Sequence, residues 1–262
     1  MPIDGPQQLL YEKKEQIAYI TINRPERMNS LSVQAWDMLN DALERLDRDS
    51  DVRVAIITGA GEKAFCVGMD MKEASEIKAG GGPDILKLVK DPMLQNVRKV
   101  KKPIIAAVNG MAFGGGFLLA QNCDLRIAVT GAQFGITEAR VGRGSPWAVP
   151  LLWMLPLGIA LELTLTGEPI TAQRAYELGL VNKVVSRDQL MSTATAMAEA
   201  ISNNAPLSVM AAKESFYKAM DLGCQAGFEK ALEIYEPVYA SEDAVEGPRA
   251  FAEKRKPAWK GR

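Results

Sequence analysis

Two loops that contain glycine follow strand-like apolar runs and are the first candidates for chemistry. A glycine triplet, 114–116, comes after the run 103–108, and the segment 65–70 comes after the run 52–58. Glycine at a strand-to-helix turn lets a ligand approach the backbone, and the first N–H groups of a helix have no partner within the helix. We therefore expect the two loops to direct two N–H groups at one oxygen atom.

Glu138 is the carboxylate best placed for proton transfer. The sequence contains no histidine, which excludes Ser-His-Asp and Cys-His machinery and histidine-ligated metal sites. An enzyme of this composition must rely on carboxylates or backbone dipoles. Glu138 ends the extended segment 132–137 and precedes a turn with two arginines. The alternative interpretation is a solvent-facing glutamate that pairs with Arg140 or Arg143.

Composition narrows the class of protein. A chain of 262 residues with 47% hydrophobic and 24% charged residues can bury a large core. A net charge of −1 argues against nucleic-acid binding, so we expect small molecules or copies of the chain as partners. Three cysteines without a C-x-x-C pattern, and a start that does not resemble a signal peptide, indicate a cytoplasmic protein.

Two further kinds of site are not expected. The longest apolar run, 146–161, contains two prolines and falls short of the ~20 residues of a membrane-spanning helix. It is typical of core or interface, and no membrane association is predicted. The sequence lacks a Walker A motif and a G-x-G-x-x-G motif, so these two modes of nucleotide binding are not expected. No metal site is predicted either.

Strands and helices alternate along most of the chain, which predicts an α/β fold with a parallel sheet covered by helices. Expected strands are 17–22, 52–58, 103–108, 125–129 and 181–185, and expected helices are 32–46, 84–100, 117–123 and 171–179. Ser32 is a plausible N-cap for the first of these helices. Beyond Gly158 the pattern is almost wholly helical. We expect a core domain over 1–188 and a helical region over 189–262.

Several motifs resemble those of the crotonase (enoyl-CoA hydratase/isomerase) superfamily, in order between Ile17 and Lys256. They are Ile104–Gly110, Gly114–Gly116, Cys123–Asp124, Phe134–Gly135 ahead of Glu138, Leu165–Gly167 and Ala175–Val181. The resemblance implies a spiral of strand-strand-helix units and a C-terminal helical region that builds homotrimers or hexamers. It also implies an acyl-CoA thioester as substrate and no cofactor beyond the coenzyme A of that substrate.

The resemblance also implies roles for individual residues. The backbone N–H groups of Met69 and Gly115, in the two loops selected above, would hold the thioester oxygen. The positions that would bind coenzyme A are Arg27, Met28, Asp70, Met71, Lys72, Phe251 and Lys254. Phe113, Leu118 and Trp147 suggest an apolar acyl pocket, although core packing would explain them equally well.

Leu118 departs from the pattern of typical hydratases, which have a glutamate at that position and a second one at the position of Glu138. One carboxylate suffices to move a proton between carbons, so the leading hypothesis is a 3-enoyl-CoA to 2-enoyl-CoA isomerase. In it Glu138 removes a C2 proton and returns it at C4. Alternatives are an enoyl-CoA hydratase or dehydratase, with Glu138 alone or with Asp70 or Glu73, and a non-catalytic acyl-CoA binding subunit.

Overall fold

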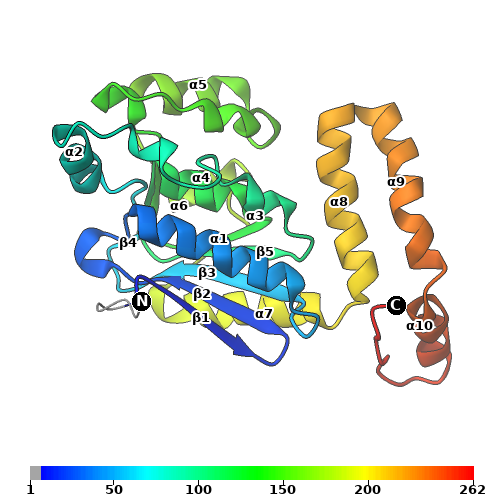
Figure 1. Ribbon diagram of the computed structural model, residues 1–262. Helices are drawn as coiled ribbons and strands as arrows, with labels where there is room; N and C mark the ends of the chain where they lie inside the picture. Colours follow the sequence, from blue (N-terminus) through cyan, green and yellow to red (C-terminus); the bar gives the residue numbers. More distant parts are fainter. Residues whose placement is uncertain (1–6) are drawn as a thin grey trace.

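Two β-sheets lie side by side in the computed structural model, which describes residues 7–262 (Figure 1). Neighbouring strands are parallel, except that β1 and β9 run antiparallel to β2 and β8. The larger sheet has the order β1 (Leu9–Lys14), β2 (Ile17–Ile22), β3 (Val54–Gly59), β5 (Ile104–Val108), β7 (Leu125–Val129) and β10 (Lys183–Val185). The smaller has the order β4 (Ala64–Cys66), β6 (Met111–Phe113), β8 (Gln133–Gly135) and β9 (Ile170–Thr171).

The chain visits the two sheets in turn and so repeats one unit. β3 and β4 lead to α2 (Met71–Ala79), β5 and β6 lead to α4 (Gly115–Asn122), and β7 and β8 lead to the 3-10 helix η3 (Glu138–Val141). These repeats confirm the predicted α/β spiral of strand-strand-helix units. Because β4, β6 and β8 are parallel neighbours, their carboxyl ends meet at one sheet edge, and the three loops that follow them meet there too.

The larger sheet forms the centre of the core. All five residues of β5 are buried, as the unbroken apolar run predicts for a strand covered on both faces. α1 (Val33–Arg48) and α7 (Leu190–Ser202) lie on opposite sides of this sheet (Figure 1). Ser32 is the N-cap of α1, as predicted, and accepts a hydrogen bond from the Ala35 N–H at 3.0 Å.

The predicted helix over 84–100 is wrong. Only η2 (Ile85–Lys87) and α3 (Gln95–Lys99) form within it. Pro92 cannot donate a backbone hydrogen bond and disfavours helical geometry in the residue before it. Asp91 and Leu94 accordingly have positive φ angles of 49° and 47°, which end any continuous helix.

The apolar run 146–161 forms η4 (Pro146–Trp153) and the first half of α5 (Leu157–Thr166). Leu151 is fully buried, whereas Trp153 is 57% exposed. The run therefore belongs partly to the core and partly to a surface. No helix within residues 7–262 is both long enough and apolar enough to cross a membrane.

The C-terminal region is helical, as predicted. Its helices are α6 (Ala172–Glu177), η5 (Arg187–Gln189), α7, α8 (Pro206–Leu222), α9 (Cys224–Tyr239) and α10 (Glu242–Ala252). The α8–α9 hairpin projects beside the sheets, with α10 at its base (Figure 1). The domain boundary after residue 188 remains a prediction; α7, which follows it directly, packs on the larger sheet.

We expect Gly116→Ala to destabilise the fold by about 3 kcal/mol. Its Cβ would lie 1.9 Å from the carbonyl oxygen of Cys66, a backbone atom of β4. The helix propensity that alanine gains over glycine, about 1 kcal/mol, is too small to offset this clash. Urea unfolding measures the change. Gly131→Ala is the matched control, because no atom lies within 4 Å of a Cβ built there, and equal stability of the two variants would contradict the prediction.

Candidate functional site

The loops after β4 and β6 touch through their backbones and place two N–H groups side by side. A Cβ on Gly68 would lie 2.6 Å from the Gly115 nitrogen, and a Cβ on Gly115 would lie 3.7 Å from the Met69 nitrogen. Leu31 bonds to the Gly68 carbonyl at 2.7 Å and to the Asp70 N–H at 2.9 Å, which fixes the first loop. Within residues 7–262 the N–H groups of Met69 and Gly115 donate no hydrogen bond.

Glu138 comes from the third loop and reaches the same place. Its Oε1 would lie 3.2 Å from a Cβ on Gly114, so a side chain at 114 would crowd the carboxylate. The other oxygen, Oε2, is buried and has no hydrogen-bond partner among residues 7–262. Burial raises the pKa of Glu138 above its ordinary value, against the hydrogen bonds from its own backbone and from the Trp147 indole. The site therefore combines two free N–H donors with one half-buried carboxylate, whose Oε2 is buried and unpaired.

Trp147 orients this carboxylate. Its indole Nε1 donates a hydrogen bond to Glu138 Oε1 at 3.2 Å. The Trp147 carbonyl accepts a hydrogen bond from Gln121 Nε2 at 3.0 Å, and its ring packs edge-on against Phe117 with centroids 6.1 Å apart. The sequence placed Trp147 in an apolar pocket and missed this donor role, because nothing in the spacing of 138 and 147 shows that a 3-10 helix folds back over η3.

The two arginines near Glu138 pair elsewhere, which rules out the surface ion pair considered above. Arg140 pairs with Glu168. Arg143 donates two hydrogen bonds to Asp84, at 2.7 and 3.1 Å, and so ties the segment after α2 to the turn after Glu138. No local pattern predicts this second pair, because Asp84 and Arg143 are far apart in the chain.

Neither Asp70 nor Glu73 is free to replace the carboxylate missing at Leu118. Asp70 accepts hydrogen bonds from Arg24 at 2.8 Å and from the first N–H groups of α2. Burial disfavours the charged form of Asp70, but these bonds outweigh it and hold its pKa below the ordinary value. Glu73 Oε2 accepts a hydrogen bond from the Val33 N–H at 3.1 Å. Both side chains stabilise helix ends.

Leu118 and Phe113, for which an acyl pocket is predicted, lie on either side of the glycine loop 114–116. Leu118 is one turn into α4, with its N–H bonded to the Gly114 carbonyl at 3.0 Å, and it is 2% exposed. Phe113 ends β6 and its ring packs on Gly135 of β8, where a Cβ would lie 3.1 Å from the ring. The isobutyl group of Leu118 offers water no hydrogen bond.

The predicted coenzyme A residues fall into two groups. Arg27, Met28, Asp70, Met71 and Lys72 surround the start of α2, and Arg27 Nε lies 3.7 Å from Asp70 Oδ2. Met71 is 52% exposed beside this cluster.

Phe251 and Lys254 form the second group, and their role in binding coenzyme A stays a prediction. They lie at the end of α10, across the molecule from α2 (Figure 1), and Phe251 is 87% exposed. One chain therefore does not bring the two groups together.

Comparisons with known proteins identify the family of the chain. The family model described as enoyl-CoA hydratase/isomerase matches residues 12–262. The chain is 41% identical to an (E)-benzylidenesuccinyl-CoA hydratase of Thauera aromatica, over 95% of this chain and 98% of that one. It is 40% identical to a carnitinyl-CoA dehydratase of Proteus mirabilis, over 93% and 94% of the two chains. The structure of an enoyl-CoA hydratase from Bacillus anthracis superposes with a TM-score of 0.91 at 35% identity, over 98% and 100%.

We expect Trp147→Phe to raise the pKa of Glu138 further, because the indole N–H stabilises the ionised carboxylate. Carbon-13 NMR titration of labelled glutamate side chains measures the pKa, with the Glu138 signal assigned by its loss in Glu138→Gln. Trp153→Phe is the matched control, since Trp153 lies on the same helix and is 57% exposed. An unchanged pKa in Trp147→Phe would contradict the role of the indole.

Proposed function

The chain belongs to the crotonase, or enoyl-CoA hydratase/isomerase, family, and from that premise we propose that it adds water to an enoyl-CoA thioester or removes it from the 3-hydroxyacyl product. One observation carries the proposal: the half-buried carboxylate of Glu138, whose buried Oε2 has no partner, lies beside two free N–H groups. The names of both relatives, a hydratase and a dehydratase, support the addition or removal of water as the reaction type.

The two N–H groups supply the electrostatic part of the reaction. In the proposal, those of Met69 and Gly115 donate to the thioester oxygen, which becomes an enolate oxygen when water attacks C3. Each donor aimed at such an oxygen is worth about 3 kcal/mol of barrier. The neighbouring backbones hold both donors in place before the substrate arrives, so little reorganisation accompanies the step.

One carboxylate can complete the hydration. Ionised Glu138 accepts a proton from water as the water oxygen bonds to C3 and the C2=C3 electrons move onto the thioester oxygen. Glu138 then returns that proton to C2 as the carbonyl reforms. One water molecule thus supplies both groups that are added, and the carboxylate is regenerated without a cofactor. Trp147 holds Oε1, which leaves Oε2 for the proton.

Isomerisation of 3-enoyl-CoA to 2-enoyl-CoA is the second candidate, favoured by Leu118. With an isobutyl group in place of a second carboxylate, water is held less firmly, and Glu138 can instead carry a proton from C2 to C4. Both candidates use the same enolate and differ only in whether water enters the product. A non-catalytic acyl-CoA binder is disfavoured by Glu138, because binding alone does not require a buried carboxylate with an unused oxygen.

We expect Glu138→Gln to lower kcat by about 10²- to 10⁴-fold while acyl-CoA binding persists, because glutamine is similar in shape but cannot carry the proton. Turnover in deuterated water, followed by mass spectrometry, measures the loss and separates the candidates: hydration adds water, and isomerisation does not. The exposed Glu168→Gln is the matched control.

The pH dependence tests the same role. Since the carboxylate must be ionised, kcat/KM of the wild type should fall as the pH drops through the raised pKa of Glu138. Near-normal turnover of Glu138→Gln would refute Glu138 as the proton carrier.

We further propose that the chain assembles as a homotrimer or a pair of trimers through its C-terminal helices. α8 and α9 carry large exposed apolar side chains that nothing in one chain covers, including Phe216, Phe228, Leu232 and Tyr239. An assembly would bury them and could bring Phe251 and Lys254 to the coenzyme A of a neighbouring subunit.

Light scattering should report a mass three or six times the 28.5 kDa of one chain. We expect Phe228→Lys with Leu232→Lys to lower that mass, because charged side chains resist burial. Gln225→Lys, an exposed position on the same helix, should leave it unchanged. A wild type that is monomeric at micromolar concentration would contradict the proposal.

A further inference from the structure

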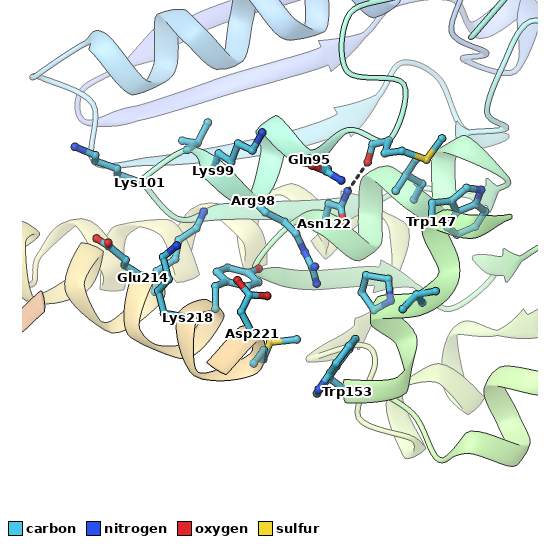
Figure 2. A pocket seen from close by; sticks show the side chains of 18 of the residues that line it. Gln95, Arg98, Lys99, Lys101, Asn122, Trp147, Trp153, Glu214, Lys218 and Asp221 are labelled. Carbon is cyan, nitrogen blue, oxygen red and sulfur yellow. Dashed lines mark hydrogen bonds between the residues drawn. The ribbon is translucent and has the colours of Figure 1, made fainter. Parts of the chain in front are cut away.

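A cavity of about 840 Å³ lies between α3, η4 and α8, and its walls are of two kinds (Figure 2). One wall is apolar and is formed by Leu118, Pro146, Trp147 and Trp153. The other carries positive charge from α3 and α8. A cavity with this division suits a ligand that has an apolar stem and an anionic end.

Arg98 extends from α3 into this cavity (Figure 2). Its Nε and Nη2 are buried and have no hydrogen-bond partner among residues 7–262. The guanidinium lies over the Tyr217 ring, 5.1 Å from the centroid, which fixes its plane. The neighbouring Lys213, by contrast, is neutralised by Asp124 at 2.8 Å. Buried donors without a partner are costly, so the two free donors of Arg98 favour the binding of an anion in this cavity.

The cavity adjoins the catalytic site through two residues that belong to both. Trp147 lines it and donates to Glu138 at 3.2 Å, and Leu118 lines it one turn after Gly114. Asn122, a further turn along α4, lines it as well. At 1.5 Å per helical residue, the axial distance from Gly115 to Asn122 is about 10 Å. An acyl group whose thioester oxygen is held at Gly115 can therefore extend into the cavity.

We propose that the substrate's acyl group ends in a carboxylate and that Arg98 binds it. This inference rests on the proposed function and specifies its substrate class: a monothioester of coenzyme A with an unsaturated dicarboxylic acid. A guanidinium with two free donors can bind a carboxylate through two hydrogen bonds, while the apolar wall covers the stem.

Two carboxylates also line the cavity, and neither takes the place of this ligand. Glu214 and Asp221 belong to α8 and are exposed, so water and salt weaken their interactions. Neither accepts a hydrogen bond from the buried Nε or Nη2 of Arg98. The two buried, unpaired donors of Arg98 therefore remain available for a carboxylate of the ligand.

The test compares linear 2-enoyl-CoA thioesters of increasing chain length, each with a methyl end and with a carboxylate end. At the best length, wild type should turn over the carboxylate form with a kcat/KM about 10- to 100-fold higher than the methyl form. Arg98→Met should abolish this preference, chiefly through KM, and Arg98→Lys should restore part of it. Lys87→Met, which removes an exposed lysine that does not line the cavity, is the matched control and should keep the preference.

The other outcomes are distinct. Preference for the methyl form at every length, or an equal loss on both forms in Arg98→Met, overturns the inference while the proposed function stands. If Arg98→Met loses activity equally on both forms and its mass by light scattering also changes, Arg98 is a subunit contact, and the inference is again overturned. If no thioester is turned over, the proposed function fails; calorimetric binding of the saturated thioesters then decides whether Arg98 distinguishes the two ends.

Discussion

The backbone contact between the loops after β4 and β6 is the constraint on which the site depends. A Cβ on Gly116 would lie 1.9 Å from the Cys66 carbonyl, and one on Gly68 would lie 2.6 Å from the Gly115 nitrogen. No side chain fits between these segments. Two N–H groups from different strands can therefore share one ligand atom, because the contact sets their separation before any ligand binds. The parallel pairing of β4 with β6 brings the segments to this distance.

The helix that starts at this contact is also fixed at its other end. Arg126 is buried in β7 and donates hydrogen bonds to the carbonyls of Cys123 and Ala120, at 2.6 and 3.2 Å. A cation at the C-terminus of a helix satisfies its last carbonyls and complements its dipole. Because the N-terminus of α4 carries the Gly115 N–H, Arg126 stabilises the helix dipole whose positive end lies at the proposed oxyanion site. The site thus extends to a residue that touches no substrate.

What the sequence could predict depended on local or repeated patterns. Glycine after a buried strand predicted both loops, since their role follows from backbone geometry. The Met69 and Gly115 assignments, however, came from the family resemblance. The continuous helix expected over 84–100 does not form, because Pro92 interrupts it. The Trp147 bond to Glu138 and the free guanidinium of Arg98 depend on how η4 and α3 pack, which no local pattern reveals. Phe251 and Lys254 were placed by position in the chain, and one chain does not bring them to the site.

Glu138 shows how stability and reactivity oppose each other here. A buried acceptor without a hydrogen bond costs about 1 to 3 kcal/mol, and Oε2 is such an acceptor among residues 7–262. Supplying a donor would stabilise the ionised form, lower the pKa of Glu138 and occupy the oxygen that takes the proton in the proposed reaction. The Trp147 bond to Oε1 alone is a compromise, since it orients the carboxylate and leaves the second oxygen reactive. Leu118 is consistent with this arrangement, because its isobutyl group has no donor that could occupy the free oxygen of Glu138.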